Sequence, residues 1–239
     1  MVNFNTITAN DTVGRMATTY DFGQVTAMAG ESDSFSPRYL TVANFQYPNP
    51  EEVGIGVCGW TDTASVCATS INGNSAVQQF GLPSSIWSGD TTEVDNLGAK
   101  DQLKLIVNAG YQFTGQFILG SLDDNNGSGG FEDGYVTYGA STVHFTRTAT
   151  GAVVDMGTAT IGHAAGFGAD VFLLTLGNFS PSITQVMFAA GAPGNTTGTN
   201  NDYLVTAADV TPVPLPAAGW LLLGGLGALR AALRRRSLG

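Results

Sequence analysis

The stretch DQLKLIVNAGYQFTGQFIL, residues 101–119, decides the fold, because apolar and polar side chains alternate along it twice. In the first run, Leu103, Leu105 and Val107 alternate with Gln102, Lys104 and Ile106. In the second run, one face carries Tyr111, Phe113, Phe117 and Leu119. A period of two residues is typical of β-strands with one buried face. The stretch therefore predicts two half-buried strands.

The same alternation recurs further along the chain, with Val143 and Phe145 in one run and Val186 and Phe188 in another. The run 171–176 is apolar on both faces and predicts a central strand. Further strands are expected over residues 38–45, 53–60, 152–161 and 203–209. Clusters of turn-forming residues lie at 47–52, 71–75, 123–130 and 191–202. Residues 1–210 are therefore predicted to form an all-β, antiparallel β-sandwich of jelly-roll-like design.

The charge of the chain is divided unevenly. All 19 acidic residues lie at or before Asp209, whereas four of the nine Lys and Arg residues follow it. An acidic body argues against nucleic acid or an anionic membrane surface as its partner. Solubility explains such a charge, and cation binding is the alternative.

The C-terminal segment TPVPLPAAGWLLLGGLGALRAALRRRSLG begins at Thr211 and has its own pattern. The proline-rich stretch 211–216 predicts an extended linker. The apolar run 217–229 has 13 residues, and continuing it past Arg230 to Leu233 gives 17. Seventeen residues is about the lower limit for crossing a bilayer, provided that Arg230 snorkels. We therefore predict a transmembrane helix and cytoplasmic tail over 217–239, with the body outside.

These residues resemble the PEP-CTERM class of sorting signals, in which a proline motif, a short apolar helix and a C-terminal arginine cluster follow in order. The motif Val213-Pro214-Leu215-Pro216-Ala217 is similar to the VPLPA-CTERM variant. The cluster consists of Arg230, Arg234, Arg235 and Arg236. The resemblance implies processing by an exosortase, which cuts near the proline motif. It also implies a Gram-negative bacterium that makes exopolysaccharide, with passage from the inner membrane to the cell surface or extracellular matrix.

The first residues of the chain depart from the pattern of such proteins, whereas part of the body fits it. Proteins with such tails are expected to begin with a secretory signal peptide, and the first 22 residues carry neither a basic nor an apolar region of that kind. We expect a start further upstream or a trimmed sequence, and rank last the alternative that the tail itself drives insertion. Val94-Asp95-Asn96 followed by Asp101-Gln102-Leu103 resembles a β-sandwich ectodomain of other PEP-CTERM proteins, over residues 38–210. That resemblance implies no activity.

Two sets of side chains are candidates for bonds that stabilise the body. Cys58 and Cys67 are close in sequence, and export favours a disulfide between them over two buried thiols. Calcium takes six to eight oxygen ligands, often from separate loops. Candidate calcium ligands are Asp95, Asp101, Asp123, Asp124 and Asn125, which solvated turns would also explain.

Signals for catalysis are weak. Gly54, Gly56 and Gly59 fit G-x-G-x-x-G, but a strand-like segment follows where dinucleotide binding requires a helix, so close packing in a strand is the preferred interpretation. His144 lies on the polar face of its strand and His163 near a turn, without the spacing of a zinc site. No G-x-S-x-G nucleophile motif occurs.

The sequence thus favours a non-enzymatic, exported surface or matrix protein associated with exopolysaccharide. A carbohydrate-binding module is the first alternative, and it requires exposed aromatic rings such as Trp60 and Trp87 on one sheet face. A secreted hydrolase is the second, and it requires two carboxylates or a Ser/His pair that converge in a pocket.

Overall fold

A computed structural model describes most of the predicted body. Among the residues that it describes, no helix is long and apolar enough to cross a membrane. The predicted tail beyond Val213 lies outside them. The described residues are 1–4, 18–31, 36–38, 40–45, 52–57, 94, 101–122, 131–191 and 203–213.

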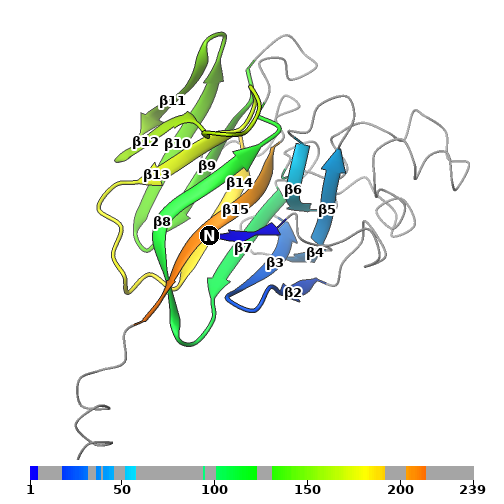
Figure 1. The fold of residues 1–239 in the computed structure, drawn as a ribbon, viewed down its shortest axis with the longest axis vertical. Helices are drawn as coiled ribbons and strands as arrows, with labels where there is room; N and C mark the ends of the chain where they lie inside the picture. The colour runs from blue at the N-terminus through cyan, green and yellow to red at the C-terminus, as the bar shows by residue number, and fades with distance from the viewer. Residues whose placement is uncertain are drawn as a thin grey trace, which may run out of the picture.

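The described strands form two antiparallel sheets, as the alternation predicted. The first sheet contains seven strands of the described chain, with β15 and β8 at its centre (Figure 1). Short β1 (Val2–Asn3) pairs with β15 outside the main order. The order is β12 (Ala159–His163), β13 (Phe172–Leu176), β8 (Tyr111–Gly120), β15 (Leu204–Pro212), β6 (Glu52–Val57) and β5 (Leu40–Phe45).

The second sheet contains eight strands of the described chain, and β4 (Ser36–Arg38) pairs with β3 outside the main order. Strand β11 lies at one end of the order, and its described neighbour in the sheet is β10. The order is β11 (Gly151–Met156), β10 (Ser141–Thr148), β9 (Asp133–Tyr138), β14 (Gln185–Ala190), β7 (Asp101–Val107), β3 (Val25–Glu31) and β2 (Thr19–Asp21).

A single apolar core joins the inner faces of the two sheets. The rings of Phe117 on β8 and Phe188 on β14 meet at 5.2 Å between centroids, and those of Phe145 and Tyr203 meet at 5.4 Å. Both phenylalanines of the first pair come from runs in which the sequence alternates, and both are fully buried. Edge-to-face ring packing adds to the free energy of burial of such pairs. The all-β, sandwich-like prediction is confirmed for the described residues.

Two predicted strands differ from the observed ones. The expected strand 152–161 is two strands, β11 and β12, which belong to different sheets and are joined at Gly157. Gly157 has a φ of 91°, and a Cβ there would lie 2.5 Å from the Thr142 carbonyl oxygen, so the chain turns in a space that only glycine fits. The run 171–176 forms β13, which is next to the edge of its sheet, with Leu173 and Thr175 half-buried.

Strand β15 continues two residues into the predicted linker, because Thr211 pairs with Gln112 and Pro212 with Tyr111. Proline lacks the N–H that a fully paired strand position requires. Beyond Ala208, the described partners of β15 lie only on its β8 side. Pro212 therefore occupies a position where a missing N–H costs little.

Candidate functional site

The predicted sorting motif begins where the last strand of the sandwich ends. The backbone N–H of Val213 donates to the Gly110 carbonyl oxygen at 2.8 Å, in the turn between β7 and β8. The Val213 side chain is 45% exposed. The end of β15, orange in Figure 1, thus brings the first motif residue to the surface. Pro214, Leu215, Pro216, Ala217 and the four arginines lie outside the described residues.

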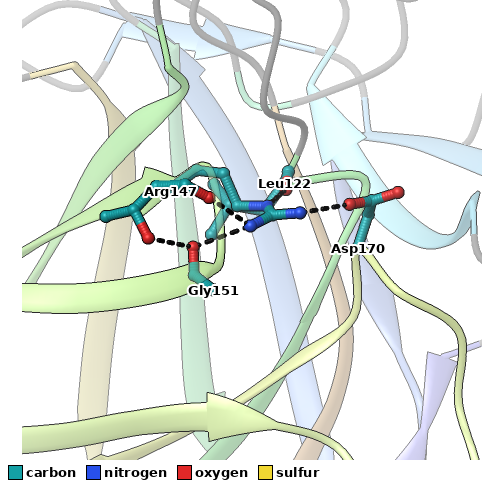
Figure 2. Close-up of polar contacts among 5 residues, drawn as sticks. Leu122, Arg147, Gly151 and Asp170 are labelled. Atoms are coloured by element: carbon teal, nitrogen blue, oxygen red, sulfur yellow. Dashed lines mark hydrogen bonds and ion pairs between the residues drawn. The ribbon is translucent and has the colours of Figure 1, made fainter.

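Two basic side chains on β10, Arg147 and His144, each lie within hydrogen-bond distance of two or more acceptors. The sequence did not indicate a role for either of them. Arg147 continues the inward series of Val143 and Phe145 and is buried. Its guanidinium donates from Nε to the Leu122 carbonyl oxygen at 3.1 Å and from Nη2 to Asp170 Oδ1 at 2.9 Å (Figure 2).

The remaining Arg147 nitrogen, Nη1, closes the turn between β10 and β11. It donates to the Gly151 carbonyl oxygen at 2.8 Å and to the carbonyl oxygen of Thr148. The guanidinium carbon also lies 5.1 Å from the ring centroid of Phe172 on β13. Because Arg147 spreads five donors in one plane, a single side chain joins the segment that follows β8, the β10–β11 turn and the loop before β13.

His144 points the other way, onto the outer face of the second sheet. Its Nε2 lies 2.8 Å from Asp133 Oδ2 on β9, and its Nδ1 lies 2.6 Å from Asp155 Oδ1 on β11. The pairing of β10 with β11 shifts here, with His144 opposite Met156 and Phe145 opposite Val154. Asp155 is therefore the extra residue of a β-bulge, a feature that redirects side chains in sheets. The bulge brings the Asp155 carboxylate to the ring.

The environment of His144 favours its charged form. Burial lowers the pKa of the imidazole, but hydrogen bonds to Asp133 and Asp155 and the charges of these carboxylates outweigh burial, so the pKa is raised above its ordinary value of 6.5. The ring is 12% exposed and Asp155 is 48% exposed. Because carboxylates occupy both ring nitrogens, His144 has no nitrogen left to act as a base toward a hydroxyl group.

One of the predicted calcium ligands lies within the described residues. Asp101 is fully buried at the start of β7, opposite Glu31 of β3, and alternation places it on the same face as Leu103. The described part of the chain contains no group of three or more His, Cys, Asp or Glu side chains arranged to hold a metal ion. Asp95, Asp123, Asp124 and Asn125 lie outside it, so calcium stays a prediction.

Of the other predicted residues, some lie within the described part of the chain and some lie outside it. Cys58, Cys67, Trp60 and Trp87 lie outside the described residues. Gly54 lies in β6, and a Cβ there would be 2.8 Å from the Val205 carbonyl oxygen of neighbouring β15. The interpretation of this glycine as a close-packing residue in a strand is confirmed.

His163, which sequence placed near a turn, is the last residue of β12, and its ring stacks on that of Phe172 at 4.8 Å between centroids. Phe172 is also the ring that Arg147 contacts, so a histidine and an arginine both lie against one buried phenylalanine. Such stacking explains the position of His163 without a ligand.

Comparison with known proteins gave no match: no protein-family model, curated protein or solved structure resembled the chain significantly.

Proposed function

We propose that this chain is an exported, non-enzymatic surface or matrix protein whose C-terminal segment is a sorting signal processed by an exosortase. One observation carries the proposal: the Val213–Ala217 motif, the apolar run 217–233 and the arginine cluster follow each other in the order that such signals require. The apolar run would form a single membrane helix with the arginines in the cytoplasm. The jelly-roll-like body would stay outside and associate with exopolysaccharide.

The junction between body and tail supports this proposal. A processing enzyme needs access to the backbone at its motif, and Val213 is exposed at the surface end of β15. The hydrogen bond from Val213 to Gly110 anchors the chain up to the motif, so a cut beyond it would leave every described strand intact. Release would then leave the sandwich complete.

Substitution of the motif prolines tests the proposal in a producing bacterium. Pro214→Ala with Pro216→Ala is expected to leave the body folded but to retain the uncut chain in the membrane fraction. Pro181→Ala is the matched control, because Pro181 lies in the exposed turn before β14, far from the motif in sequence. Equal release of a shortened chain from the motif variant and the control would contradict the proposal.

A further inference from the structure

The two hydrogen bonds of His144 require a particular protonation state. A neutral imidazole has one N–H donor and one acceptor nitrogen, whereas the imidazolium has two donors. Both ring nitrogens of His144 lie within hydrogen-bond distance of a carboxylate oxygen, which can only accept. Loss of the proton would place a nitrogen lone pair against a carboxylate on one side or the other. The geometry therefore fits the charged ring only.

The carboxylate of Asp133 depends on this ring. Its Oδ1 atom is buried and accepts no hydrogen bond from the described residues, and its Oδ2 atom contacts His144. A partly buried carboxylate without a compensating charge is costly. When His144 loses its proton, Asp133 loses the positive charge that compensates it.

The groups that face the ring come from both neighbouring strands. Strand β9 contributes Asp133 and Tyr135, the latter directly opposite His144, and β11 contributes Asp155. The same-face neighbours on β10 itself are Thr142 and Thr146, which carry no charge. Thr146 supports the arrangement by donating to Asp155 Oδ2 at 3.3 Å. The charges around His144 among these neighbours are thus both negative.

We propose that protonated His144, held between Asp133 and Asp155, is a clip that fastens edge strand β11 to β9 and β10 and opens as the pH rises. Apart from the clip, β11 is held by its backbone pairing with β10, by its contacts with β12 and by Ala152 and Val154, which pack against the core. In the described sheet β11 pairs with β10 alone, and Val153 and Met156 are exposed on it. An edge strand with little buried surface opens at lower cost than the centre of a sheet.

The direction of the pH effect follows from the raised pKa. The folded protein binds the His144 proton more tightly than the unfolded chain, whose histidine titrates near 6.5. The stabilisation is therefore complete below that value and is lost as the pH rises through the pKa of the folded state. The clip is therefore closed at pH values below the pKa of folded-state His144 and opens above it.

Hydrogen exchange at the amides of β11 tests the clip in the full chain. The protection factors of β11, divided by those of central strand β14, are expected to fall about fivefold between about pH 6 and about pH 9. His144→Gln should remove this fall, because glutamine does not titrate. The control is His163→Gln, which changes the other histidine and should leave the fall intact. A ratio that stays constant in the unmodified protein, or an equal fall in His144→Gln, would overturn the proposal.

A second variant keeps the test decisive if His144→Gln does not fold. Asp155 is half exposed, so Asp155→Asn should fold and should weaken only one side of the clip. In a His163→Gln background, NMR titration follows the His144 ring alone. Adding Asp155→Asn should move its midpoint to lower pH, and an unchanged midpoint would show that Asp155 does not hold the proton.

Discussion

Arg147 and His144 lie three residues apart on β10, and they differ in the face they occupy and in whether their charge depends on pH. Arg147 points into the sandwich, is 6% exposed and reaches one carboxylate and three carbonyl oxygens. His144 points outward and reaches two carboxylates. Arginine stays charged at every physiological pH, whereas histidine changes charge there. The same strand therefore carries a permanent fastening on its inner face and a conditional one on its outer face.

The largest effect is expected from removing the permanent charge. Arg147→Met keeps much of the packed side-chain stem but removes the hydrogen bonds that the guanidinium donates to Asp170 and to the Leu122, Thr148 and Gly151 carbonyl oxygens, of which that of Gly151 still accepts from the Thr148 hydroxyl. Breaking a buried ion pair costs about 3 kcal/mol of the free energy of unfolding, and the loss should not vary between about pH 6 and about pH 9. Chemical denaturation at these two pH values measures both the loss of free energy of unfolding and its pH dependence. A strong pH dependence of this loss would contradict the claim that the contribution of Arg147, unlike that of His144, is independent of pH.

Arg147→Lys separates the charge from the shape of the side chain. Lysine retains the positive charge but cannot reach Leu122, Gly151 and Asp170 with one planar group. We expect a loss of about 2 kcal/mol, since lysine cannot replace all the buried and partly buried hydrogen bonds that the guanidinium donates. Chemical denaturation compares the free energy of unfolding of this variant with that of Arg147→Met. Full stability of the lysine variant would show that only the charge of Arg147 contributes.

Removing the conditional charge should have a smaller effect that depends on pH. His144→Gln is expected to lower the free energy of unfolding by about 1 kcal/mol near pH 6, because a charge-assisted pair of hydrogen bonds is lost at a partly exposed site. The difference should shrink as the pH rises through the pKa of folded-state His144, because the ring of the unmodified protein then loses its proton. Denaturation curves at about pH 6 and about pH 9 measure this difference in free energy of unfolding. A constant difference would mean that packing, and not charge, is what His144 contributes.

The smallest effect is expected at the exposed carboxylate. Asp155→Asn should cost about 0.5 kcal/mol near pH 6, because Asp155 is half exposed and water competes for its hydrogen bonds. Added salt should reduce this loss, while the loss in Arg147→Met should be almost insensitive to salt. Equal sensitivity in the two variants would indicate that both sites are screened alike.

The sequence predicted several strands whose inward residues are large, although β9, with buried Val136 and Tyr138, was missed. Strands β7, β8, β10 and β14 follow from Leu, Val and Phe at every second position. Strand β3 was missed because Ala27 and Ala29 carry much of its inward pattern, and alanine gives a weak hydrophobic signal. The break between β11 and β12 depends on a single glycine, Gly157, which strand periodicity passes over.

The two charged sites were beyond sequence reasoning for a different reason. Asp133 and Asp155 each lie 11 residues from His144, one before it and one after it, and only the pairing register and a bulge bring them to its ring. Arg147 did leave a signal, since it occupies an inward position after Val143 and Phe145. A charge in such a position indicates buried partners but does not identify them.

The sorting proposal rests on local sequence, and its most direct test is the intact mass of the protein isolated from the organism that makes it. A mass that ends close to Pro216 is the predicted result, because the proposed processing enzyme would remove the apolar run and the arginine cluster and leave the sandwich. A mass that still includes Arg234, Arg235 and Arg236 would contradict the proposal, since the tail would then be a permanent part of the protein.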